Sequence, residues 1–134
     1  MISRAEVLPG NIGYVEIRHF VGGTAEFDAA MEKVRGVAGL VLDLRQCAGG
    51  NREQVRHLST YFYARRTRLP SRQARSDQAP IEDWTLDSVP GPRFPETPTY
   101  VLTSQRTFSA AEGFALGLRV TGRALLVGER TGEP

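Results

Sequence analysis

The stretch of residues 39–51, Gly39-Leu-Val-Leu-Asp-Leu-Arg-Gln-Cys-Ala-Gly-Gly-Asn51, decides the fold. Its first half is a nearly continuous apolar run, which is typical of a strand covered on both faces in a parallel sheet. Its second half is a glycine-rich turn, and the spacing of Val55, Leu58 and Phe62 after it predicts a helix over about residues 52–63. The stretch therefore predicts a buried parallel strand that passes through a tight turn into a helix.

The same alternation of strands and helices extends along the chain on both sides of this stretch. Residues 12–18 alternate apolar and polar side chains, as a half-buried strand does. A helix is predicted to begin at Thr24 and to end at Gly39, since glycine commonly follows the last turn of a helix. Further on, the patterns predict strands over residues 99–103 and 124–128 and a helix over residues 109–121. This order predicts an α/β fold with a mainly parallel sheet and crossover helices.

The composition limits the number of domains and the kinds of partner. The chain has 134 residues, of which 40% are apolar, so we expect one domain over residues 1–134 with a core that needs no disulfide or metal. A single cysteine excludes an internal disulfide. A net charge of +2 is too small to indicate nucleic acid. No apolar run approaches a membrane span, and the first residues show no signal-peptide stretch, so we expect no membrane partner, and the compartment stays open.

Residues 70–98 contain most of the prolines and predict a long irregular excursion across the surface. Trp84 is interpreted as a local anchor of this segment rather than as a platform for a ligand. The arginines that precede it lack interleaved aromatic residues and are interpreted as a solvated loop; they are Arg65, Arg66, Arg68, Arg72 and Arg75.

Two loops are candidates for a functional site. Ligands of parallel sheets bind beyond the carboxyl ends of the strands, and residues 46–51 and 104–109 occupy that position. Ser109 would begin the helix there, where unpaired N–H groups stabilise developing negative charge around a nucleophile. The spacing Ser109-Ala-Ala-Glu112 equally fits a capping box with a purely structural role. The residues alone leave both interpretations open.

The glycine pair of the first loop gives a weaker signal. Gly49 and Gly50 permit close backbone approach, so one of their N–H groups could face an oxyanion together with that of Ala110; an ordinary turn is the alternative. Cys47 is interpreted as a small buried filler. His19 and His57 are too far apart in sequence to indicate a metal site and are interpreted as surface or packed residues, so we expect no metal or cofactor.

In this order, these segments resemble peptidase family S41, which contains tail-specific or C-terminal processing proteases, the tricorn core protease and the modules of interphotoreceptor retinoid-binding protein. The matching segments are residues 13–17, Gly39-Leu-Val-Leu-Asp-Leu-Arg-Gln-Cys-Ala-Gly-Gly50, Tyr100-Val-Leu-Thr-Ser-Gln-Arg-Thr-Phe-Ser-Ala-Ala-Glu-Gly-Phe-Ala115, and Gly122-Arg-Ala-Leu-Leu-Val-Gly-Glu-Arg-Thr-Gly132.

The resemblance implies the ClpP/crotonase-like fold and a serine peptidase acting on peptides or proteins. It places Ser109 at the nucleophile position and the N–H groups of Gly49, Gly50 and Ala110 at the oxyanion. An alternative of another class is a non-catalytic module that binds a lipophilic ligand, as in the retinoid-binding relatives. The oligomeric state stays open, and assembly through exposed sheet edges is a third possibility.

The general base departs from the family pattern. In the branch of the family that uses a Ser/Lys pair, the position of the general-base lysine falls on Pro134 of this chain. The only lysine here is Lys33, in the first predicted helix. Residues 128–132 instead resemble the other branch, whose His and Glu partners lie outside the matched segments. The base is therefore unidentified, and we expect the chain to be a truncated portion of an S41-like domain, whose own activity is an open question.

Overall fold

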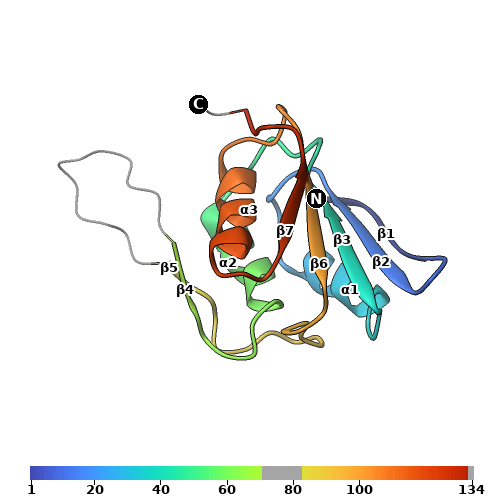
Figure 1. Cartoon of the computed structure of the whole chain (residues 1–134). Coiled ribbons are helices and arrows are strands. Elements are labelled where there is room, and N and C mark those ends of the chain that lie inside the picture. Colours follow the sequence, from blue (N-terminus) through green and yellow to red (C-terminus); the bar gives the residue numbers. More distant parts are fainter. Residues whose placement is uncertain (71–82, 133–134) are drawn as a thin grey trace.

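The computed structural model describes residues 1–70 and 83–132, which form a five-stranded sheet with helices packed on it (Figure 1). The strands lie in the order β1-β2-β3-β6-β7, and their bounds are β1 (Ile2–Leu8), β2 (Ile12–Ile17), β3 (Gly39–Asp43), β6 (Thr99–Thr103) and β7 (Leu125–Gly128). Strands β2, β3, β6 and β7 run parallel, and β1 pairs antiparallel with β2. The predicted α/β class and mainly parallel sheet are confirmed.

Strand β1 was not among the predicted strands. It joins β2 through a tight turn in which Gly10 and Asn11 both adopt positive φ angles, 88° and 61°. Leu8 pairs with Ile12 across this turn, so the first residues of the chain form a β-hairpin at the edge of the sheet.

Three helices follow the predicted order. They are α1 (Ala25–Lys33), α2 (Arg52–Thr60) and α3 (Ala110–Val120). The prediction that the first helix continues to Gly39 is wrong, because the chain leaves the helix at Val34 and turns through Gly36, whose φ is +74°. None of the helices in the described part of the chain is long and apolar enough to cross a membrane.

The helices pack on one face of the sheet, around Phe20. The Phe20 ring lies 5.7 Å from that of Phe27 in α1 and 5.4 Å from that of Phe114 in α3, which places both helices on the same side. On the opposite face, Tyr100 and Val127 are 43% and 48% exposed. In the described part of the chain, helices cover one face of the sheet only, but β3 itself is buried as predicted, apart from the half-buried Val41.

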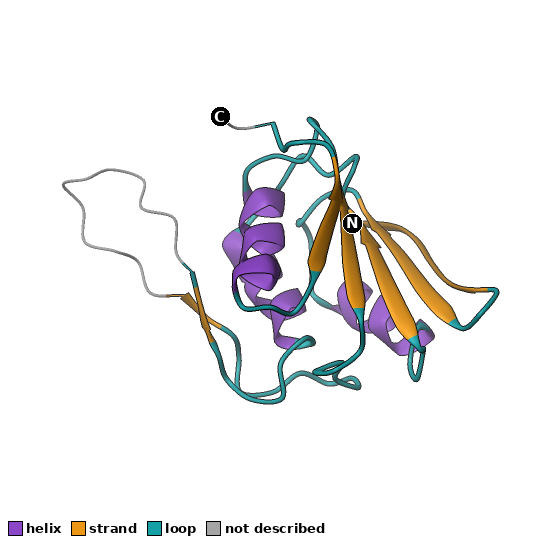
Figure 2. Ribbon diagram, viewed as in Figure 1, coloured by secondary structure: helices purple, strands orange, loops and turns teal. Residues whose placement is uncertain are grey.

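The proline-rich segment contains a short strand. Within it, β5 (Asp83–Trp84) pairs antiparallel with β4 (Arg68–Leu69), and both strands lie apart from the main sheet (Figure 2). The guanidinium of Arg66 lies 4.3 Å from the centre of the Trp84 ring, so Trp84 attaches β5 to the residues just before β4. Residues 71–82, including the predicted solvated Arg72 and Arg75, lie outside the described residues.

Candidate active site at the start of α3

Ser109 occupies the position between β6 and α3 that the sequence predicts. It has φ 56° and ψ −118°, and among the described residues only Asn11 shares a positive φ without being glycine. Such a conformation costs roughly 1–3 kcal/mol and persists only where the surroundings enforce it, most often at functional sites. The Ser109 side chain is exposed, so the strained backbone presents its hydroxyl to the surface.

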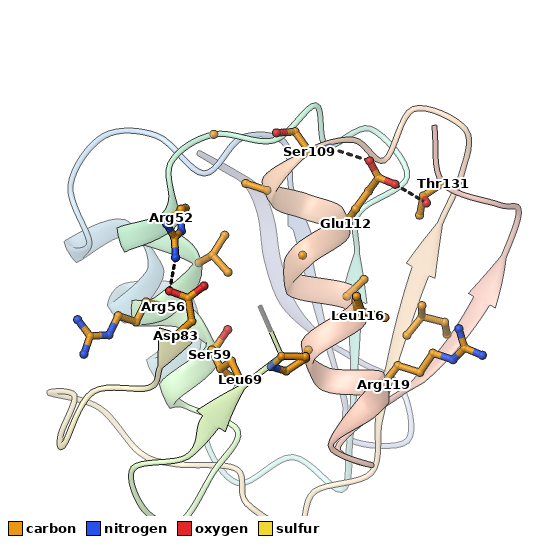
Figure 3. Close-up of a pocket in the computed structure, with 18 residues that line it drawn as sticks. Arg52, Arg56, Ser59, Leu69, Asp83, Ser109, Glu112, Leu116, Arg119 and Thr131 are labelled. Atoms are coloured by element: carbon orange, nitrogen blue, oxygen red, sulfur yellow. Dashed lines mark hydrogen bonds and ion pairs between the residues drawn. The ribbon is translucent and has the colours of Figure 1, made fainter. Parts of the chain in front are cut away.

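Glu112 holds Ser109 in this conformation. Its Oε1 atom accepts a hydrogen bond from the Ser109 N–H at 2.9 Å, and its Oε2 atom accepts one from the Thr131 hydroxyl at 2.6 Å (Figure 3). The capping box expected from the Ser-x-x-Glu spacing is therefore present. It coexists with a Ser109 side chain that is exposed at the surface.

The Gly49-Gly50 loop lies directly against this segment. A Cβ atom on Gly49, whose φ is +112°, would lie 2.9 Å from the carbonyl oxygen of Phe108 and 3.3 Å from the nitrogen of Ala110. The Phe108 N–H also donates to the Cys47 carbonyl at 3.1 Å. Only glycine fits at position 49, so the sequence makes this close approach of two loops possible.

Gly50 faces a third segment. A Cβ atom there would lie 2.1 Å from the carbonyl oxygen of Phe20, and Phe20 also exchanges backbone hydrogen bonds with the neighbours of Gly50. The Phe20 N–H donates to the Gly49 carbonyl at 2.7 Å, and the Phe20 carbonyl accepts from the Asn51 N–H at 2.8 Å. The glycine loop is therefore clamped between the chain that follows β2 and the start of α3.

Three backbone N–H groups near Ser109 lack a backbone acceptor. Within the described residues, the N–H groups of Gly49, Gly50 and Ala110 make no hydrogen bond to another backbone group. Ala110 is the first residue of α3, where backbone donors lack partners within the helix. The pKa of the buried Cys47 thiol is raised by its burial and lowered in smaller part by the Gly49 backbone.

Ser104 and Thr107 also position the site and were missed by the sequence analysis. The Thr107 hydroxyl donates to the Leu44 carbonyl at 2.8 Å, and the Ser104 hydroxyl donates to the Arg45 carbonyl at 2.6 Å. Both bonds tie the loop after β6 to the loop after β3. Short hydroxyl side chains just beyond a buried strand were the available signal, because such residues commonly bind nearby backbone groups.

A groove of about 560 Å³ begins at Ser109 and follows α3. Its walls come from α2, α3, the β4–β5 hairpin and the chain near β7 (Figure 3). Arg52 forms an ion pair with Asp83, and the Arg56 Nε atom donates to the Trp84 carbonyl at 2.5 Å; both interactions attach the hairpin to α2. None of the described residues that line the groove is a histidine or a lysine.

Neither the histidines, His19 and His57, nor Lys33 is among the residues that line the groove at Ser109. His57 Nε2 lies 2.7 Å from Oδ1 of Asp28, which also accepts a hydrogen bond from the Tyr61 hydroxyl, so His57 is packed between α2 and α1 as predicted. Lys33 is the last residue of α1. The described residues contain no cluster of His, Cys, Asp and Glu that could hold a metal ion.

Comparisons with known proteins identify relatives of this arrangement. The family model described as peptidase family S41 matches residues 11–133. The carboxy-terminal processing protease CtpA of Bacillus subtilis is 29% identical over 130 residues, which cover 95% of this chain and 27% of that protease. The photosystem II D1 C-terminal processing protease is similar in structure, with a TM-score of 0.72 and 29% identity over 95% of this chain and 33% of that one.

A crystal structure of a peptidase from Parabacteroides merdae shares the fold, with a TM-score of 0.78 and 22% identity over 96% of this chain and 43% of that chain. The chain thus spans less than half the length of these relatives. Their protease descriptions do not favour the alternative of a module that binds a lipophilic ligand. Because the family model covers nearly the whole chain, this protein belongs to peptidase family S41.

Proposed function

We propose that this chain carries the nucleophile and the oxyanion donors of a serine peptidase, and that hydrolysis proceeds through an acyl-enzyme on Ser109. One observation carries the proposal. Ser109 is held in a strained conformation with an exposed side chain, and the two loops that meet beside it carry the N–H groups of Gly49, Gly50 and Ala110, which lack a backbone acceptor within the described residues.

In this proposal each group has a role. The Ser109 hydroxyl oxygen attacks the peptide carbonyl carbon as its proton passes to a general base, and the resulting oxyanion accepts hydrogen bonds from the Ala110 N–H and from an N–H of the Gly49-Gly50 pair. The C–N bond then breaks, and the amine leaves with the proton from the base. Water attacks the Ser109 ester by the same route, releasing the carboxylic acid and restoring the hydroxyl.

Gly49 serves this arrangement in two ways. The resemblance to the family assigns its N–H to the oxyanion together with that of Gly50, and within the described residues neither N–H has a backbone acceptor. We therefore propose the Gly49-Gly50 pair as the source of the donor from this loop. Gly49 also lets the loop approach Phe108 and Ala110 closely.

We further propose that the general base lies outside the residues that line the described groove. Glu112 is the carboxylate nearest in sequence to Ser109, but its Oε1 atom binds the Ser109 N–H and its Oε2 atom binds Thr131. A serine without a base is a weak nucleophile. Serine proteases deprived of their triad nonetheless retain about 10³–10⁴-fold catalysis over water from the oxyanion hole and binding.

Labelling with a fluorophosphonate, followed by intact-mass analysis, tests the proposal. We expect one slowly formed adduct on the folded chain, no adduct on the Ser109→Ala variant, and the parent adduct on Ser88→Ala, a matched change at an exposed serine outside the groove. An adduct that survives in Ser109→Ala, or a folded parent chain that acquires none at high reagent concentration, would overturn the proposal.

A further inference from the structure

Ser59 has a hydroxyl that is open to the groove and has no protein partner among the described residues. It is 3% exposed, it lines the groove, and within the described residues its side chain has no hydrogen bond. The next residue, Thr60, shows the usual arrangement for a helix, since its hydroxyl donates to the Arg56 carbonyl at 2.8 Å. A hydroxyl that forgoes this bond and faces a groove is available to a ligand, since a neutral hydrogen bond to it is favourable.

The walls around Ser59 form a slot between α2 and α3. Val55 and Ser59 are four residues apart on α2, and Gly113 and Gly117 are four residues apart on α3, so each pair lies on one helix face. A Cβ atom on Gly113 would meet nothing within 4 Å, so the missing side chain leaves open space there. At Gly117 the corresponding atom would lie 4.0 Å from Leu69, which closes the far end.

The slot leads away from the nucleophile. Ser109 and Gly50 line the groove near the starts of α3 and α2. Ser59 lies about 10 Å along α2 from Arg52, the first residue of that helix, because an α-helix rises 1.5 Å per residue. Figure 3 shows Ser109 at the upper end and Ser59 beside Leu69 towards the lower end. A side chain that enters next to the attacked carbonyl must be long to reach Ser59.

The chemistry of the walls selects the kind of side chain. Val55, Leu69 and the two glycines offer apolar contacts, and Ser59 offers one neutral hydroxyl at depth. The acids of the groove are engaged, Asp83 by Arg52 and Glu112 by Thr131. The side chains of Arg56 and Arg119 point away from Ser59 (Figure 3), so a charged end beside Ser59 would lack a counter-charge. Among uncharged side chains with a polar end, tyrosine is the longest and carries a flat apolar body.

We propose that the slot between α2 and α3 binds a substrate tyrosine beside the scissile bond and that Ser59 hydrogen-bonds its phenol hydroxyl. This inference rests on the proposed placement of Ser109 as the nucleophile. A site that pairs with a hydroxyl discriminates against the analogue that lacks it, because its own polar group is then left unpaired. Ser59 is thus a specificity-determining residue for tyrosine over phenylalanine.

Reversible binding tests the slot separately from catalysis. In the full chain carrying Ser109→Ala, N-acetyl-tyrosinamide and N-acetyl-phenylalaninamide are titrated while the backbone amide resonances are followed by NMR. We expect tyrosinamide to bind about five- to tenfold more tightly, which is the effect of one neutral hydrogen bond. Shifts should centre on Val55, Gly113 and Gly117.

Adding Ser59→Ala removes only the hydroxyl, and since alanine favours helices and no bond is lost, we expect this variant to fold. The ratio of the two affinities should then fall to about one, whereas Ser88→Ala should keep the parent ratio. The inference would be overturned if the parent bound both amides equally or bound neither. It would also be overturned if the preference for tyrosinamide survived Ser59→Ala, or if the resonance shifts lay elsewhere. A failure of fluorophosphonate labelling would overturn only the proposed nucleophile.

Discussion

Gly49 and Ser109 are packed so closely that a Cβ atom on Gly49 would lie 3.1 Å from the Cβ atom of Ser109. The two residues come from different crossover connections, after β3 and after β6, and these strands are parallel neighbours in the sheet. Their contact joins the glycine loop to the start of α3.

Gly49→Ala should damage both the stability of the chain and the reactivity of Ser109. The added methyl group would meet Phe108 at 2.9 Å, and alanine is strained at a φ of +112°. We expect a loss of about 1–3 kcal/mol in the free energy of unfolding. Urea unfolding measures the stability, and the rate of fluorophosphonate labelling, which we expect to fall at least tenfold, measures the displacement of the donors.

Gly23→Ala is the matched control for this change. Gly23 is exposed, its φ lies outside the positive region, and a Cβ atom there would meet nothing within 4 Å. Its unfolding free energy should stay within about 0.5 kcal/mol of the parent, as for most surface substitutions. Equal effects of the two variants would show that the contact between Gly49 and Ser109 has no special role.

Glu112→Ala should release Ser109 from its capped conformation. The Ser109 N–H would lose its acceptor at 2.9 Å and Thr131 its partner at 2.6 Å, so we expect a loss of about 1 kcal/mol, typical of a helix cap. Glu112→Gln keeps an oxygen acceptor for the Ser109 N–H, so its free energy of unfolding should fall by less. Urea unfolding of the two variants checks this order, and a larger loss in Glu112→Gln would contradict it.

The sequence predicted the fold best where one physical pattern dominated. The strands from β2 onward in the main sheet and the starts of the helices followed from apolar periodicity and from the residues that begin helices. Strand β1 was missed because its exposed edge position weakens the apolar pattern, although Pro9, Gly10 and Asn11 before β2 were a usable turn signal. The uncovered face of the sheet was missed because an apolar strand does not reveal what packs on each side.

The candidate site was predicted in part. Its two loops followed from the rule that ligands bind beyond the carboxyl ends of parallel strands. The bonds from Ser104 and Thr107 to the loop after β3 depend on which strands are neighbours, which the local sequence does not reveal. Ser59 was invisible for a similar reason, since the space beside it depends on how α2, α3 and Leu69 meet.

His57 should be structural and separate from the chemistry of Ser109. Its Nε2 atom binds Asp28 in a cluster with Tyr61 that joins α2 to α1, and it does not line the groove. We expect His57→Ala to lower the free energy of unfolding by about 1–3 kcal/mol, because it leaves Asp28 with fewer partners. The rate of fluorophosphonate labelling, measured under conditions where the variant is folded, should stay within about twofold. A loss of labelling would instead make His57 a candidate base.

Asp43 should make the stability of the fold depend on pH, with a loss of stability in acid. Burial by itself would raise the pKa of Asp43, but hydrogen bonds from Arg45, at 3.0 and 2.8 Å, and from the Tyr14 hydroxyl outweigh it and hold the pKa below its usual value. A lowered pKa in the folded state contributes stability that is present above the unfolded pKa of about 3.9 and is lost as the pH falls through the folded value.

Asp43→Asn should therefore cost about 1.5–3 kcal/mol near neutral pH, as expected for hydrogen bonds to a charged group. The difference from the parent should shrink below about pH 4, where the parent carboxylate also becomes protonated. Urea unfolding of both proteins from pH 7 down to pH 3 measures this difference. Glu32→Gln is the control, because the Glu32–Arg35 pair is exposed and such pairs contribute little. A difference that is constant with pH would show that the Asp43 side chain stabilises the sheet through packing rather than through its charge.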